Sequence, residues 1–253
     1  MREITMGTNT TGMATSPLDG KELIEAALAI PPSSPGSEAD AAAVRTTYAK
    51  ESGSIGSVPP PASLKGMAKA VGELIQGRPP ALLIDKLGER LAFERSGTRL
   101  YEALIAKYDA DGSFEGGPTR ADLEAIRDDE MRHAALVCGA MERLGADPTA
   151  MTPGADLVGL ASSGVLSVAV EPRISFGQSL QALLIAELTD NDSWRMLIDL
   201  ATAYGQTEMA AEFRAAEQHE AHHLELCRRW LSSLLALGAR GEPTAPASPQ
   251  QAA

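Results

Sequence analysis

Apolar residues recur every three to four positions along four long stretches of the chain, which is the spacing of one face of an α-helix. In the first stretch Leu83, Leu87 and Leu91 follow this spacing. A helix-start signal, Thr119 followed by Asp122 three residues later, marks the second. The pattern predicts long helices over residues 80–108, 119–145, 175–204 and 206–238.

The segments outside these helices have a different composition. Residues 1–62 are rich in Ser, Pro, Gly and Thr, which predicts a loosely ordered N-terminal extension with one short helix over residues 21–30. A short amphipathic helix with Met67 and Val71 on one face is expected to open the domain of residues 63–240. Prolines among small and polar residues predict a disordered tail over residues 241–253.

The connections between the predicted helices indicate how they are arranged. A short turn joins the first helix to the second, and Gly205 joins the third to the fourth, whereas about thirty residues separate the two pairs. Antiparallel neighbours need only short loops, and a long connection crosses the fold. The predicted fold is therefore all-α, an antiparallel four-helix bundle built from two helix pairs joined by a long crossover.

The two helix pairs also repeat the same chemical pattern. Glu94, which precedes Tyr101 by seven residues, corresponds to Glu187, which precedes Trp194 by seven. The motif Glu-x-x-His occurs once in each pair, in the second and fourth helices, as Glu130–His133 and Glu220–His223. The offset between the pairs is 93 residues for the first element and 90 for the second.

This repeat predicts a metal site. Residues three apart share one helix face, so each Glu-x-x-His directs a carboxylate and an imidazole into the same volume. Glu94 and Glu187 lie mid-helix among apolar residues, where a carboxylate is costly to bury without a partner. A single Glu-x-x-His is usually an exposed helix pair, but two copies at corresponding places favour two metal ions held between four helices.

Residues 80–238, with this order of Glu, Glu-x-x-His, Glu and Glu-x-x-His, resemble the di-iron carboxylate proteins of the ferritin-like superfamily. The segment from Asp129 to Ala134 looks like the corresponding segment of bacterioferritin and rubrerythrin. The resemblance implies two Fe ions, with Mn as the alternative, and a tyrosine beside them that could donate an electron, here Tyr101. As an alternative, Tyr101 is a core aromatic. The ligands that the resemblance implies are Glu130 and Glu220 as bridges, Glu94 and His133 on one ion, and Glu187 and His223 on the other.

Two departures separate the chain from those relatives. The family pattern implies that Asp129 holds His223, but His219 stands where the matching Asp for His133 is expected. Glu217, one turn before Glu220, is either a substitute or a solvated surface carboxylate. The chain also lacks the CxxC iron site of a complete rubrerythrin.

Composition narrows the functions further. With 34 acidic and 22 basic residues the formal net charge is -12, which disfavours binding to nucleic acid or to anionic membrane surfaces. The two cysteines form no CxxC pair, and no targeting segment is apparent, so a cytoplasmic location is expected. The longest nearly uncharged run, residues 157–170, is expected to be too short to span a membrane.

These observations favour a di-iron or di-manganese oxidoreductase that reduces O2 or peroxide. It would act as a homodimer with an external electron donor. One alternative is an iron-storage ferritin with a ferroxidase centre, and another is a metal-free helical interaction module. The enzyme assignment therefore stays open between an oxidoreductase and a ferroxidase.

Overall fold

The computed structural model of the 253-residue chain describes residues 7–8, 11–31, 36–61, 66, 80–242 and 244. This part of the chain is all-helical, as predicted from the sequence, and it contains seven helices and no strand. The helices are α1 (Pro17–Ala29), α2 (Glu38–Glu51), α4 (Pro80–Asp111), α5 (Arg120–Arg143), α6 (Pro153–Val170), α7 (Phe176–Ala203) and α8 (Thr207–Arg240). The short helix expected around Met67 and Val71 lies outside the described residues.

The chain divides into two compact units, residues 2–54 and residues 55–253. The first unit contains α1, near the helix expected over residues 21–30, and α2, which we did not predict. Helix α2 begins with a capping box, in which the Ser37 hydroxyl accepts from the Asp40 amide and the Asp40 carboxylate accepts from the Ser37 amide. No residue of α2 is buried, so it lacked the apolar periodicity used to find the other helices.

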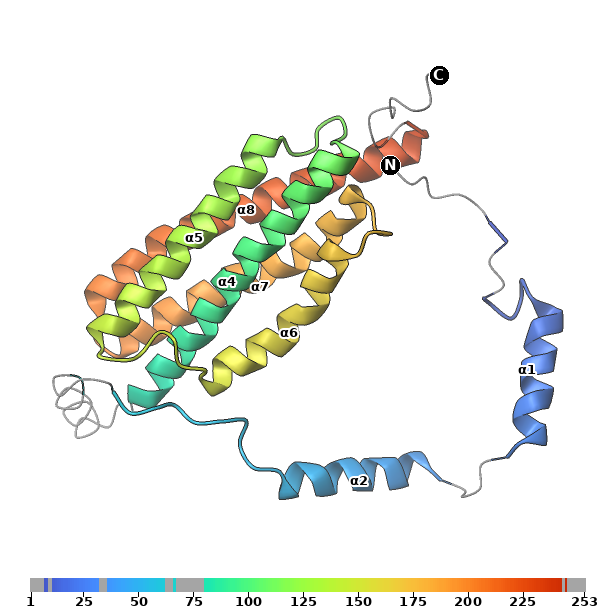
Figure 1. The fold of residues 1–253 in the computed structure, drawn as a ribbon, viewed down its shortest axis with the longest axis horizontal. Helices are drawn as coiled ribbons and strands as arrows, with labels where there is room; N and C mark the ends of the chain where they lie inside the picture. Colours follow the sequence, from blue (N-terminus) through green and yellow to red (C-terminus); the bar gives the residue numbers. More distant parts are fainter. Residues whose placement is uncertain are drawn as a thin grey trace. The chain divides into compact units, whose positions relative to one another are not determined.

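The second unit contains the four long helices predicted from the sequence (Figure 1). Helix α4 packs against α5 and α7, and α8 packs against α7 and α5. Gly205 turns the chain between α7 and α8 with φ of 70°, a conformation that favours glycine. A capping box between Thr119 and Asp122 starts α5.

Helix α6 occupies the long crossover, where the sequence pattern predicted no helix. It packs along α4 and α7. Two glycines allow the close approach to α4, because a Cβ atom on Gly88 would lie 2.4 Å from the Thr152 hydroxyl and one on Gly154 would lie 2.9 Å from the Cβ of Glu89. Thr152 caps the N-terminus of α6.

The expectation that no segment reaches membrane-span length is wrong for α6. The helix begins at Pro153 rather than Leu157, and its 18 residues are long and apolar enough to cross a membrane by length and composition. No other helix in the described part of the chain meets this test. Only 17% of these residues are buried, and Leu157 and Leu160 are exposed.

The core of the second unit consists of two apolar clusters separated by a polar layer. One cluster includes Leu91, Val137 and Phe213, and the other includes Leu100, Leu123, Leu183 and Cys227. Along each of the four long helices, the Glu of the predicted ligand set lies between residues of the two clusters. The packing therefore places four carboxylates from four helices at one level, surrounded by apolar side chains.

Candidate metal centre

All six residues predicted as metal ligands lie in this buried polar layer. None of their side chains reaches the surface, although carboxylates are rarely buried unless they are paired. Their exposed fractions are 0% for Glu94, 1% for Glu130, 3% for His133, 2% for Glu187, 0% for Glu220 and 2% for His223.

Glu220 lies between the two imidazoles. Its Oε1 is 2.6 Å from Nδ1 of His133, and its Oε2 is 3.1 Å from Nδ1 of His223. A second carboxylate approaches the same nitrogen of each ring: Glu94 Oε2 is 3.7 Å from His133 Nδ1, and Glu130 Oε1 is 4.0 Å from His223 Nδ1. Both imidazoles therefore present Nδ1 to the carboxylates, and Glu220 contacts both of them.

The outer nitrogen of each imidazole has its own partner. Nε2 of His223 lies 3.3 Å from Oδ2 of Asp129, as the resemblance implied. Nε2 of His133 lies 3.3 Å from Nδ1 of His219, which thus takes the place of the expected Asp. A proton on each Nε2 would leave each Nδ1 free to bind a cation, so these contacts orient both rings for ligation.

Glu187 differs from the other predicted ligands. Its Oε1 accepts a hydrogen bond from the hydroxyl of Tyr101, which is itself buried. Glu187 belongs to none of the groups of ligand atoms that lie within 4.8 Å of one another. Those groups are Glu94, His133 and Glu220; Glu130, Glu220 and His223; Glu94, Glu130, Asp190 and Glu220; and Asp129, His133 and His219. Tyr101 therefore holds Glu187 at the side of this cluster.

Arg90 and Asp190 complete the polar layer, and the sequence reasoning missed both. Nε of Arg90 lies 2.7 Å from Glu94 Oε1, and its Nη1 lies 2.8 Å from Asp190 Oδ1. Arg90 is one turn before Glu94 and Asp190 one turn after Glu187, so helical periodicity could have placed both on the inward faces. Neither residue has a counterpart in the other half, where Leu183 and Gly97 stand at the matching positions, so the internal repeat does not reveal them.

Gly97 provides space for the cluster. A Cβ atom at this position would lie 2.1 Å from Oε2 of Glu130. Glycine in a helix interior is unfavourable, so its presence one turn after Glu94 reflects this packing. The position of Gly97 relative to Glu94 matches that of Asp190 relative to Glu187 in the repeat.

Several buried ligand atoms lack a hydrogen-bond partner. Such atoms indicate whether the site fits a cation, because a bound cation would be their partner. His133 Nδ1 and Glu220 Oε1 approach each other without hydrogen-bond geometry. The other unpartnered atoms include Glu94 Oε2, Glu130 Oε2 and Glu187 Oε2. Unsatisfied buried polar atoms are costly, and cations bound among them would satisfy all five. The residues therefore fit a metal centre.

The excess of negative charge in the polar layer also fits a bound cation. Five buried carboxylates, of Glu94, Glu130, Glu187, Asp190 and Glu220, face the guanidinium of Arg90, the one buried arginine among the described residues. With every carboxylate ionised and both imidazoles neutral, as metal binding requires, four negative charges are unbalanced, which equals the charge of two divalent ions. Burying such an excess without counterions is strongly unfavourable.

The pKa values of these groups reflect the crowding. Burial raises the pKa of Glu94 to about 6 and that of Glu187 to about 8, and it raises the pKa of Glu130 and of Asp190 well above their usual range. Burial acts in the same direction on Glu220, but the two imidazoles outweigh it and lower that pKa to about 2. The metal-free cluster therefore keeps some carboxyl groups protonated.

Two further candidates face away from the cluster. Glu217 pairs with Arg195 at 3.0 Å, and His222 is exposed on α8. Neither belongs to a group of converging ligand atoms in the described residues.

Comparisons of the chain with models of protein families, with curated proteins and with solved structures found no match. The site is therefore defined by its geometry alone, as a buried cluster of carboxylate and imidazole groups that could hold a metal.

Proposed function

We propose that helices α4, α5, α7 and α8 form a ferritin-like four-helix bundle around a pair of metal ions, and that the protein is a non-haem di-iron or di-manganese oxidoreductase. The observation that carries this proposal is the convergence of unpartnered ligand atoms from all four helices in one buried layer. Carboxylate oxygens with imidazole nitrogens suit iron and manganese better than metals that prefer thiolates.

The ligand assignment follows from the contacts. Glu94 and His133 would form one set of ligands and His223 would begin the second, and Glu130 and Glu220 would bridge the two ions, because Glu130 and Glu220 form a compact group with Glu94 and also with His223. Glu187 would complete the second set by exchanging its hydrogen bond to Tyr101 for the ion. Bound there, the metal pair would supply the electrons that reduce O2 or peroxide.

The remaining residues position and balance these ligands. Asp129 and His219 orient the imidazoles through their outer nitrogens. Arg90 neutralises part of the negative charge by contact with Glu94 and Asp190. The apolar clusters on both sides exclude bulk water from the polar layer, which strengthens each of these electrostatic contacts.

Elemental analysis of the purified chain tests the metal centre. We expect about two transition-metal ions per chain, and a loss of both in Glu130→Ala and Glu220→Ala. Glu217→Ala and His222→Ala are matched controls on α8 that should keep the metal. A metal content near zero after growth in iron-replete and in manganese-replete media would show that the cluster is not a metal site.

Activity and size distinguish the enzyme from a storage ferritin. The reduced, metal-loaded protein should consume O2 or peroxide with turnover when an external electron donor is supplied. Size-exclusion chromatography should show a homodimer. Elution as a cage of many subunits that accumulates iron would instead favour the ferroxidase alternative.

A further inference from the structure

Two neighbouring helices of the second unit, α6 and α7, carry exposed apolar stripes. Leu157, Leu160 and Gly164 follow one another at intervals of three and four residues, so they lie on one side of α6, where all three are exposed. The stripe on α7 consists of Ile185, Leu188 and Met196, which are also exposed. The α5 and α8 helices, of 24 and 34 residues, expose one large apolar side chain each. We call the two stripes together the α6–α7 face.

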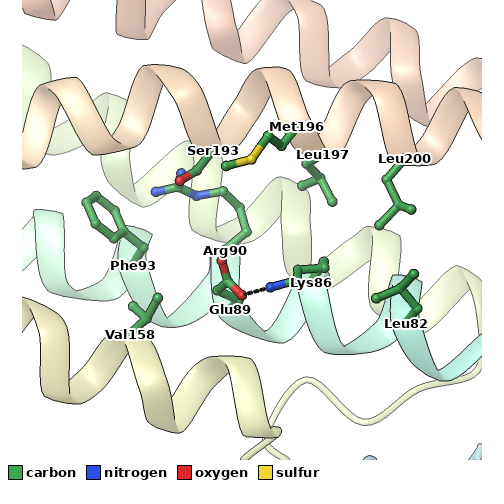
Figure 2. Close-up of a pocket in the computed structure, with 10 residues that line it drawn as sticks. All are labelled: Leu82, Lys86, Glu89, Arg90, Phe93, Val158, Ser193, Met196, Leu197 and Leu200. Carbon is green, nitrogen blue, oxygen red and sulfur yellow. Dashed lines mark hydrogen bonds and ion pairs between the residues drawn. The ribbon is translucent and has the colours of Figure 1, made fainter.

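Two cavities lie between α6 and α7, over α4. The larger, of about 210 Å³, lies beside Arg90, and its wall includes Val158 of α6 and Met196 of α7 (Figure 2). The smaller, of about 80 Å³, shares Phe93 with the larger one and is lined by Ala161 and by residues of α7. An apolar cavity of about 150 Å³ can hold benzene, so the larger cavity has room for a leucine side chain.

The α6–α7 face also carries side chains that project next to these cavities. Leu157 precedes Val158 and Leu160 precedes Ala161, so an exposed leucine stands beside a lining residue of each cavity. A surface that presents both projecting side chains and cavities to receive them can pair with an identical copy around a twofold axis. A Cβ atom at Gly164 would meet nothing within 4 Å in this chain, so the chain's own packing does not require this glycine, whereas close approach of a second helix would.

Charge favours a second copy as the occupant of this face. The chain has a formal net charge of -12, so like-charge repulsion opposes most contacts between two copies. Helix α6 carries one charged residue among its 18, Asp156 in the first turn, whereas 22% of the whole chain is charged. On α7 the exposed Asp192 is paired with Arg195 at 3.5 Å. Two copies that meet through this face therefore avoid most of the repulsion.

The size of the face is close to what a stable dimer needs. Helix α6 has 18 residues and is about 27 Å long, and two helices side by side are about 20 Å wide, so the face covers on the order of 500 Å² before the relief of the side chains is counted. Specific interfaces bury about 800 Å² per partner. Exposed apolar patches of this size mark interaction sites.

A lipid bilayer is the competing occupant, because α6 is long and apolar enough to cross one. Both ends of α6 are fixed to the bundle, however. At its start the Gly154 amide donates to the Asp85 carboxylate at 2.8 Å. At its end the Lys107 ammonium donates to the carbonyls of Val168 and Glu171 at 3.2 and 3.0 Å. Crossing a membrane would break these contacts, and an anionic lipid surface would repel the acidic chain.

We propose that the α6–α7 face is the interface of a symmetric homodimer, in which exposed leucines of each copy enter the cavities of the other. This inference rests on the homodimer of the proposed function and adds where its two copies meet. Dimerisation would cover the apolar side chains of both stripes, and it would close both cavities beside the polar layer.

Sedimentation velocity of the full-length protein tests this interface. The unmodified chain should sediment as a dimer. Leu160→Glu and Met196→Glu should each raise the dimer dissociation constant by at least about 100-fold, because each substitution places an unpaired carboxylate in the apolar contact twice. Leu160 and Met196 are 66% and 63% exposed in the single chain, so both variants should keep the helical circular dichroism of the unmodified protein.

Two control variants carry the same change outside the face. Met131→Glu on α5 and Leu28→Glu on α1, at side chains that are 54% and 75% exposed, should dimerise like the unmodified protein. Loss of the dimer in either control, or a dimer that survives both Leu160→Glu and Met196→Glu, would overturn the proposed interface while the homodimer itself stands.

A monomeric unmodified protein would overturn the proposal as well. Cosedimentation with phosphatidylcholine vesicles then identifies the other occupant, since binding that is lost in Leu160→Glu would assign the face to a membrane. Elemental analysis of the same samples decides the metal centre separately, so failure of the metal centre leaves these results unaffected.

Discussion

Nε2 of His133 lies 3.3 Å from Nδ1 of His219. His219 stands where an Asp was expected to support His133, and it contacts the His133 imidazole in place of that Asp. The corresponding contact in the other half joins His223 to Asp129, also at 3.3 Å. The two supports differ in chemistry, because Asp129 offers a carboxylate oxygen and His219 a ring nitrogen, which itself lies 3.7 Å from Oδ1 of Asp129. They also differ in exposure, with the side chain of His219 55% exposed and that of Asp129 19% exposed.

This difference predicts two unequal metal-binding steps. A charged acceptor strengthens an imidazole ligand more than a neutral one, so the ion on His223 should bind more tightly. We expect Asp129→Ala to weaken the tighter step by about 10–100-fold and His219→Ala to weaken the looser step by less. Anaerobic titration of the metal-free protein with ferrous or manganous ion measures both.

The exposed His222 provides the control, since His222→Ala removes an imidazole from the same helix turn without touching the cluster. Two equal steps in the unmodified protein would contradict the assignment of the two supports. So would a larger effect of His219→Ala than of Asp129→Ala on the tighter step.

The metal-free protein should lose stability as the pH rises from about 5 to 8.5. Glu187 has a pKa of about 8 in the folded chain against a usual 4.5, so between these values it is protonated when folded and ionised when unfolded. Unfolding then releases a proton, which makes it easier as the pH rises. His223 acts in the same direction between 6.5 and its folded pKa of about 9, since the nearby Glu220 outweighs its burial.

Differential scanning calorimetry checks this expectation. Tm of the metal-free protein should fall by on the order of 5 °C over this range, and Glu187→Gln should reduce the fall. Bound metal requires ionised carboxylates, so the increase in Tm on adding metal should grow with pH. A Tm that rises with pH in the metal-free protein would contradict the crowding of protonated carboxyl groups.

Gly97→Ala should separate metal binding from folding. The added methyl would overlap the end of the Glu130 side chain, which can swing away, so we expect less than about 1 kcal/mol loss of stability. The displaced carboxylate should cause metal content to fall toward that of Glu130→Ala. Gly139→Ala on α5 is the control, because its nearest neighbour is 3.8 Å away. Full metal content in Gly97→Ala would show that Glu130 does not need its present position.

Two truncations test the N-terminal residues. Removal of residues 1–54, which correspond to the first compact unit, should leave metal binding and Tm unchanged. Removal of residues 1–62 also deletes Val58, which packs against the first apolar cluster, and should cost about 1 kcal/mol. Urea unfolding of both truncated chains measures the difference. Equal stability of the two would show that Val58 contributes nothing.

The sequence alone was sufficient to predict the four long helices and to predict that their Glu and His residues lie at a similar depth in the fold. Glu94 and Glu187 stand mid-helix between apolar residues, and a period of 3.6 residues puts them on inward faces whatever the helices pack against. The repeat of Glu-x-x-His in both helix pairs also predicted that the polar residues of the two pairs lie at the same level along the helices. Whether these residues bind metal stays a prediction.

The pattern was not sufficient for elements without strong periodicity. Helix α2 buries no residue, and α6 has one charged residue, Asp156, to mark a solvent-facing side, so neither showed the alternation of faces that reveals a helix. Their capping residues, Ser37 and Thr152, were the available signals.

Contacts between distant residues depended on how the helices pack. Arg90 meets Asp190 across 100 positions of the chain, Tyr101 reaches Glu187 across 86, and His133 meets His219 across 86. Helical periodicity determines the direction in which a side chain leaves its own helix. The rotation of a neighbouring helix about its axis, and its shift along that axis, depend on how both apolar clusters pack. The inward carboxylates follow from local helix geometry, whereas their partners, and the cavity beside Arg90, exist because α4, α6 and α7 pack as they do.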